Sequence, residues 1–145
     1  MNTSDEIINP IPQGNYIPAT RFGNMIYTAG MTPRYNGVLI QSGKVGITEP
    51  ISIYKAAVRQ AVANALAAAM NTLAEQERLE QVLSLTVYVN AENTFQAHSS
   101  IADFASEYLF EKMGNAGIAS RAAIGVASLP DNAPVEIQLI AAVSS

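Results

Sequence analysis

Two charged side chains stand inside otherwise apolar stretches and could act together on a small substrate. Arg121 precedes the run 122–127, and Glu136 lies within the run 135–140. A guanidinium can hold a carboxylate through two parallel hydrogen bonds. A carboxylate in apolar surroundings has a raised pKa and can accept a proton from water near neutral pH. This pair suits the addition of water to a substrate that carries a carboxylate.

Both residues also have a structural interpretation, which the sequence leaves open. Arg121 could be solvated or ion-paired at the end of a strand. Glu136 alternates with Gln138, so both side chains could point into solvent from a half-exposed strand.

Three further residues are weaker candidates. Tyr16 could place a phenol at a site or be a half-buried core residue. Gly30 follows an expected strand, where a ligand could meet bare backbone N–H groups or where the glycine could simply serve a turn. His98 has no second His or Cys to orient it, which favours a surface role. The segment 43–46 lacks the spacing of a phosphate-binding loop.

The composition excludes several classes of site. The chain has 145 residues, one His and no Cys, which excludes disulfides, thiolate metal sites, cysteine nucleophiles and multi-His metal sites. A net charge of −4 and a pI near 4.8 argue against a nucleic-acid partner bound through phosphate neutralisation.

The low charge also predicts self-association. Charged residues make up 14% of the chain and hydrophobic residues 49%, whereas roughly a quarter of an average soluble domain is charged. Such a chain must cover apolar surface, and a subunit interface is the favoured way to do so.

We expect a cytoplasmic protein with no membrane contact. The first twenty residues contain Asp5, Glu6 and three prolines, which the apolar core of a signal peptide does not tolerate. The longest apolar run, 61–70, is interrupted by Asn64 and is too short to span a bilayer.

The chain divides into an N-terminal arm and a single domain. Residues 1–13 are polar and rich in proline, and 14–145 form the predicted domain. Gly23-Asn24 predicts the turn of a β-hairpin. A loop follows over 31–47, with one short strand at 38–40.

Two helices are predicted in the middle of the chain. The first begins with Thr48 as N-cap and carries an apolar stripe as far as Leu73. The second begins with Asn93 as N-cap, assisted by Gln96, and ends at Gly114.

Three more strands are predicted at 83–89, 122–129 and 135–143. The segment 130–132 is expected to join the last two as an antiparallel pair. The order β-β-α-β-α-β-β then predicts the α+β class, with a mixed sheet and both helices packed on one face.

Taken together, these residues resemble the RidA/YjgF family of imine deaminases, also labelled endoribonuclease L-PSP. The resemblance covers roughly residues 14–143, and the loop around 43–46 resembles one branch of the family. It rests on the motifs Gly14-x-Tyr16, Gly23-Asn24-x-Ile26-Tyr27-Thr28-Ala29-Gly30, Thr86-Val87-Tyr88-Val89, Ser120-Arg121-x-Ala123-x-Gly125-Val126-Ala127-x-Leu129-Pro130 and Val135-Glu136-Ile137.

The resemblance implies a chorismate-mutase-like fold and a homotrimer with ligand clefts between subunits. It implies hydrolysis of small 2-imino or enamine acids, such as 2-iminopropanoate, to 2-oxo acids and ammonia. Arg121 would hold the substrate carboxylate and Glu136 would activate water. Tyr16, Gly30 and the backbone of Ala123 would line the pocket, and no cofactor or metal is implied.

The chain departs from the family at three positions. Ala123 stands where many members carry Cys, Ala29 where many carry Ser, and Ser99 where many carry Asn. These departures keep a second function open, a trimer that binds or senses small carboxylates without turnover. The endoribonuclease of the family label is disfavoured by the acidic pI and by the absence of a basic cluster.

Overall fold

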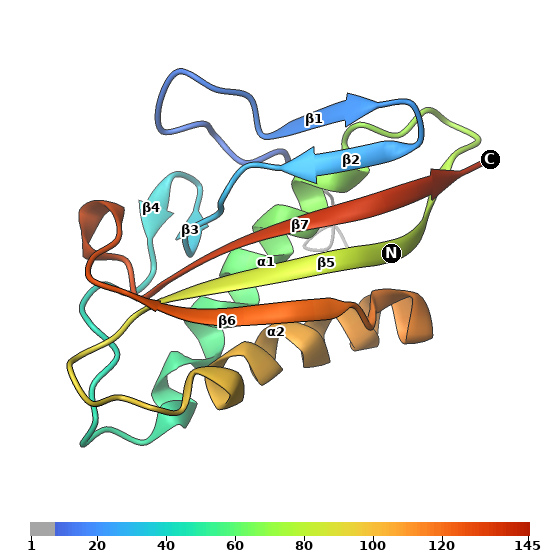
Figure 1. Cartoon of the computed structure of the whole chain (residues 1–145). Helices are drawn as coiled ribbons and strands as arrows, with labels where there is room; N and C mark the ends of the chain where they lie inside the picture. Colours follow the sequence, from blue (N-terminus) through green and yellow to red (C-terminus); the bar gives the residue numbers. More distant parts are fainter. Residues whose placement is uncertain (1–7) are drawn as a thin grey trace.

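The computed structural model describes residues 8–145, which form a five-stranded sheet with two α-helices packed against one of its faces (Figure 1). Only the β5–β6 pair is parallel, and the other neighbours are antiparallel. This mixed sheet confirms the predicted α+β class. In sheet order the strands are β1 (Ala19–Phe22), β2 (Met25–Thr28), β7 (Val135–Ser144), β5 (Arg78–Asn90) and β6 (Ser120–Val126).

The two helices cover different strands of the same face. Helix α1 (Lys55–Met70) lies against β7 and β2, and α2 (His98–Met113) lies against β6 and β5. Four alanines of α1 are 0% exposed, and their small side chains let the helix approach the sheet closely. They are Ala57, Ala61, Ala65 and Ala69.

The register of β7 separates a covered face from an open one. Its odd-numbered residues, 135 to 143, are buried beneath the helices, whereas its even-numbered residues are half-buried. Because side chains alternate along a strand, Glu136 lies on the face without helices. It is paired there with Tyr88 of β5, while its neighbour Ile137 is paired with Val87 on the covered face.

The predicted antiparallel pairing of the last two strands is wrong. Strand β5 lies between them, parallel to β6 and antiparallel to β7. The chain reaches β6 from β5 through α2, and such a crossover places its two strands side by side and parallel. The connection 127–134 then carries the chain past β5, through a 3₁₀ turn η4 (Pro130–Asn132) in which Asp131 and Asn132 have φ of 55° and 57°.

Both helices begin later than the sequence predicts. Pro50 precedes a 3₁₀ segment, η2 (Ile51–Tyr54), and α1 starts only at Lys55, so Thr48 is not its N-cap. The residue before a proline is disfavoured in the helical region, which delays the helix. Thr94 has a φ of 71°, and α2 begins after Ala97 without a side-chain cap from Asn93. Gly114, at φ 63°, ends α2 as predicted. Another 3₁₀ segment, η3 (Gly114–Gly117), follows it.

The first hairpin is confirmed, and a second one was missed. Phe22 and Met25 are paired across the turn at Gly23, which has a φ of +60°. Within the loop predicted over 31–47, β3 (Arg34–Tyr35) pairs with β4 (Val38–Leu39). The sequence indicated only the second of these two strands.

Residues 1–7 of the predicted N-terminal arm lie outside the described residues. Residues 8–13 form neither helix nor strand. Within residues 8–145, neither α-helix is long and apolar enough to cross a membrane.

Candidate functional site

The Glu136 carboxyl group lies against the backbone of Gly30 on the open face of the sheet. A Cβ atom at position 30 would stand 2.8 Å from Glu136 Cδ. Hydrogen bonds in both directions between Met31 and Ile137, of 2.7 and 2.9 Å, hold the two segments in this register. Glycine at position 30 therefore provides room for the carboxyl group.

The Glu136 side chain has the properties of a proton acceptor. It is half-buried, and burial raises the pKa of its carboxyl group. Within residues 8–145, no group donates a hydrogen bond to it. A carboxylate that is partly desolvated and unpaired can receive a proton from water near neutral pH.

Arg121 lies on the covered face and is held by α2. It is paired with Leu85 of β5, whose side chain is buried beneath the helices. Nη1 donates to Asp103 Oδ1 at 2.8 Å and to Ser106 Oγ at 2.9 Å. Nη2 donates to Ser99 Oγ at 2.8 Å and to the Ser99 carbonyl oxygen at 3.3 Å. The guanidinium is thus fixed in orientation before any ligand binds.

A single chain does not bring the two predicted groups together. Arg121 projects toward α2 from one face of the sheet, and Glu136 projects from the opposite face. Ala123 shares the face of Arg121 because it is paired with Val87, which is buried beneath the helices. The candidate residues therefore form two half-sites, one at Arg121 and Ala123 and the other at Glu136 and Gly30.

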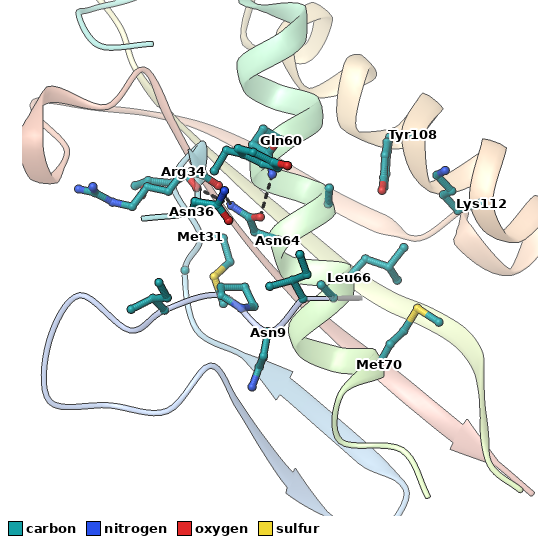
Figure 2. A pocket seen from close by; sticks show the side chains of 18 of the residues that line it. Asn9, Met31, Arg34, Asn36, Gln60, Asn64, Leu66, Met70, Tyr108 and Lys112 are labelled. Atoms are coloured by element: carbon teal, nitrogen blue, oxygen red, sulfur yellow. Dashed lines mark hydrogen bonds between the residues drawn. The ribbon is translucent and has the colours of Figure 1, made fainter. Parts of the chain in front are cut away.

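A hollow of about 720 Å³ lies over α1 (Figure 2). Tyr16 and Gly30 contribute to its lining, but Arg121, Ala123 and Glu136 do not. Asn64 lies at its wall and donates to the carbonyl oxygens of Thr32 and Arg34 at 3.1 and 2.8 Å. The Asn64 amide, which interrupts the alanine-rich run of α1, thus anchors the β3–β4 hairpin to the helix.

Tyr16 precedes β1, and its hydroxyl accepts a hydrogen bond from the Gln13 backbone N–H at 2.9 Å. The side chain is 44% exposed. It is therefore not the half-buried core residue that one interpretation of the sequence suggested.

For His98 the sequence favours a surface role, and its partial exposure is compatible with that role. His98 is the first residue of α2, and its half-buried ring lies over Gly125 of β6. A Cβ at position 125 would stand 2.6 Å from His98 Nε2. The ring thus covers the same face of β6 that carries Arg121 and Ala123.

The residues that hold Arg121 were not identified from the sequence, although a signal for them exists. Ser99, Asp103 and Ser106 are spaced i, i+4, i+7 and so lie on one face of α2. Polar residues at this spacing beside an apolar stripe form either a solvated helix face or a face that meets a polar partner. Among residues 8–145, no group of three His, Asp or Glu side chains is placed to hold a metal ion.

A family model described as "YjgF/chorismate_mutase-like, putative endoribonuclease" matches residues 6–143 of this chain. The chain belongs to the YjgF/chorismate mutase-like family. This membership confirms the resemblance that the sequence motifs indicated.

Solved structures and a curated relative agree with YjgF-family membership. Protein Atu1372 of Agrobacterium tumefaciens, of unknown function, is 31% identical to this chain, with a TM-score of 0.81. The match covers 93% of this chain and 87% of the Atu1372 chain. A crystal structure from Shewanella oneidensis, described as a "putative endoribonuclease", is 30% identical with a TM-score of 0.85, covering 93% and 89%. Protein TCP17 of Trypanosoma cruzi is 27% identical over 130 residues, covering 89% of this chain and 81% of TCP17. These structures confirm the chorismate-mutase-like fold of the YjgF family.

Proposed function

We propose that this YjgF-family protein hydrolyses small 2-imino or enamine acids, such as 2-iminopropanoate, to 2-oxo acids and ammonia. The observation that supports the proposal most directly is the Glu136 carboxyl group, which is half-buried, has a raised pKa and is unpaired within residues 8–145. Arg121 supplies the complementary cation, held in a fixed orientation by α2.

The chemistry needs a carboxylate clamp and a base. Arg121 holds the substrate carboxylate and orients the C=N carbon toward water. Glu136 accepts a proton from that water as its oxygen bonds to the carbon, and passes this proton to the imine nitrogen, which gives a tetrahedral amino alcohol. Glu136 then accepts the hydroxyl proton as the C=O bond forms and transfers it to the amine nitrogen, so that the C–N bond breaks and ammonia leaves. One water is consumed, and no electrons are transferred.

We place this site between neighbouring subunits of a homotrimer. The Arg121 and Glu136 half-sites lie on opposite faces of one sheet, so a site that uses both needs a second copy of the chain. Apolar side chains on the helix-free face support such an interface. Tyr27 and Ile124 lie on this face and are 45% and 43% exposed, and their burial would stabilise association.

A second candidate function is binding of small carboxylates without turnover. Ala29 and Ala123 lack the hydroxyl and the thiol that many family members carry at these two positions. Arg121 is still present and oriented by α2, and binding of a carboxylate needs this cation but no base.

A turnover assay separates these functions. 2-Iminopropanoate is generated in situ by an amino-acid oxidase acting on alanine, and its loss is followed with the wild-type chain, Arg121→Lys, Glu136→Gln and the control Glu80→Gln. Glu80 is an exposed glutamate of β5. We expect Glu136→Gln to lower kcat by about 10²–10⁴-fold, Arg121→Lys mainly to raise KM, and Glu80→Gln to behave as wild type.

Loss of the imine at the buffer rate with wild-type protein would refute the deaminase function for this substrate. Pyruvate binding in that case would favour the second function. A parallel incubation with single-stranded RNA tests the activity named in the family description, and we expect neither cleavage nor salt-dependent binding.

A further inference from the structure

The hydrogen bonds of Arg121 leave one edge of its guanidinium available. An arginine carries five N–H groups. The four on Nη1 and Nη2 are matched by four hydrogen bonds to Asp103, Ser106 and Ser99. Within residues 8–145, Nε of Arg121 has no acceptor. A two-pronged grip on a carboxylate needs two neighbouring N–H groups, so a ligand must combine Nε with a donor that α2 gives up.

The distances indicate which hydrogen bond between Arg121 and α2 a ligand carboxylate replaces. The hydrogen bond from Nη2 to the Ser99 carbonyl oxygen is the longest of the four, at 3.3 Å. The contact of Nη1 with Asp103 is 2.8 Å and is charge-assisted, which makes it the stronger of the two. A ligand carboxylate therefore approaches the edge formed by Nε and Nη2, while Nη1 stays on Asp103 and Ser106.

We infer that Asp103 is a positioning residue that holds Nη1 of Arg121 and, through its negative charge, weakens the binding of a ligand carboxylate at the Nε–Nη2 edge. This inference rests on the carboxylate-binding role given to Arg121 in the proposed function. The Asp103 side chain is 58% exposed, so its charge acts through solvent. Two carboxylates about 6 Å apart on one guanidinium in water repel each other enough to change the affinity roughly three-fold.

The test measures binding of pyruvate, the 2-oxo acid product, to the full chain by titration calorimetry at low ionic strength. Asp103→Asn keeps an oxygen acceptor for Nη1 and removes the charge. We expect it to bind pyruvate roughly three-fold tighter than wild type, with the difference disappearing at 1 M salt. Asp103→Ala removes the acceptor as well, so we expect it to bind more weakly than Asp103→Asn.

Asp131→Asn is the matched control. Asp131 is also paired with an arginine, Arg34, and is 68% exposed, but it lies in the connection beyond the far end of β6 from Arg121. The control makes the same change in net charge and should leave the affinity for pyruvate unchanged.

The inference is overturned by an Asp103→Asn affinity equal to that of wild type or of Asp131→Asn, or by wild-type protein that does not bind pyruvate. Equal affinities of Asp103→Asn and Asp103→Ala would remove the positioning role. Failure of the proposed function is detected separately, because it is the absence of imine turnover.

Discussion

Gly30 and Glu136 are in contact across the open face of the sheet, and the Glu136 carboxyl group fills the space where a side chain at position 30 would lie. A Cβ on Gly30 would stand 2.8 Å from Cδ and 3.1 Å from Cγ of Glu136. Gly30 does not have a positive φ, so the glycine is needed for space and not for backbone freedom. The proposed base is therefore positioned by the absence of a side chain on a neighbouring segment.

Gly30→Ala should displace the Glu136 carboxyl group and lower imine turnover by at least about ten-fold, since small errors in the placement of a base are costly. The destabilisation should be about 1–3 kcal/mol, as for other overpacked sites. Turnover and thermal unfolding measure the two effects. Gly46→Ala is the control, because a Cβ there would lie 3.4 Å from the nearest atom, Glu92 Oε1. Full activity of Gly30→Ala would contradict the role of this contact.

Glu136→Gln should raise the thermal stability of the protein at pH 7 while lowering its activity. Burial raises the folded-state pKa of Glu136 above the ordinary value of 4.5. The folded state therefore binds the proton more tightly than the unfolded state, and stability falls as the pH rises from 4.5 through the raised pKa. The difference in stability between Glu136→Gln and wild type should therefore shrink as the pH falls toward 4.5 and below.

Melting temperatures of wild type and Glu136→Gln between pH 4 and 8 check this sign. Glu80→Gln serves again as the control for the change from Glu to Gln. An advantage of Glu136→Gln that grew toward low pH would show that the carboxylate is stabilised in the folded state, which would contradict its role as an unpaired base.

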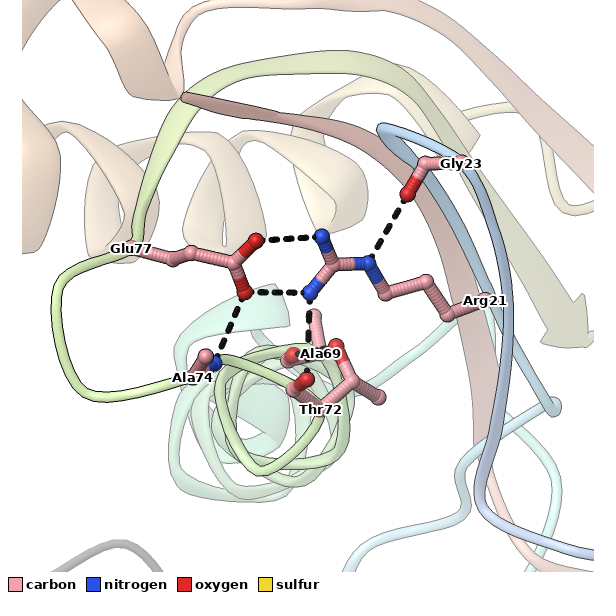
Figure 3. A network of polar contacts seen from close by, with 6 residues as sticks. All are labelled: Arg21, Gly23, Ala69, Thr72, Ala74 and Glu77. Carbon is pink, nitrogen blue, oxygen red and sulfur yellow. Dashed lines mark hydrogen bonds and ion pairs between the residues drawn. The ribbon is translucent and has the colours of Figure 1, made fainter. Parts of the chain in front are cut away.

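Glu77→Gln should lower stability at neutral pH, because Glu77 joins the β1–β2 hairpin to the loop after α1 (Figure 3). Arg21 Nη1 and Nη2 donate to its two carboxylate oxygens at 2.5 and 2.6 Å, and the Ala74 backbone N–H donates at 2.7 Å. These donors lower the pKa of Glu77 to about 2. A lowered pKa stabilises the fold above the unfolded value of 4.5, and this contribution is lost as the pH falls from 4.5 toward 2.

The measurement compares the melting temperature of Glu77→Gln with that of wild type across this pH range. Glu111→Gln is the control, because Glu111 forms a similar pair with Arg59 but is 55% exposed, against 16% for Glu77. Exposed pairs contribute little, so Glu111→Gln should have the smaller effect. Equal decreases in melting temperature at pH 7 would mean that burial of the Arg21–Glu77 pair adds nothing to the stability of the protein.

A mixture of two inactive variants should recover activity if the site is shared between subunits. Arg121→Ala keeps an intact Glu136 half-site, and Glu136→Gln keeps an intact Arg121 half-site. In randomly mixed trimers roughly one interface in four combines the two intact halves, so about a quarter of wild-type turnover should return.

The mixing experiment requires unfolding and refolding the two variants together, with each variant refolded alone as the control. Light scattering reports the mass of the assembly in the same samples. Trimers that form but recover no turnover would contradict a site built from two chains.

Local patterns in the sequence were sufficient to predict most of the helices and strands. Alternating apolar residues identified the strands around Val87, Ala123 and Ile137, and the Gly23 turn identified the first hairpin. Motifs over 120–137 identified the family and its chorismate mutase-like fold. Local backbone detail was less predictable, because Pro50 and the left-handed Thr94 shift the helix starts away from Thr48 and Asn93.

The sequence by itself determined the residue types available for chemistry, which are one guanidinium and one carboxylate within apolar strands. Tertiary structure alone decided that Arg121 faces α2 and Glu136 faces the open side of the sheet. Strand pairing depends on contacts between distant segments, and an apolar alternation is equally compatible with β6 beside β7 or β6 beside β5. The crossover through α2 made that choice, and the register of β5, β6 and β7 placed the two proposed functional groups on opposite faces.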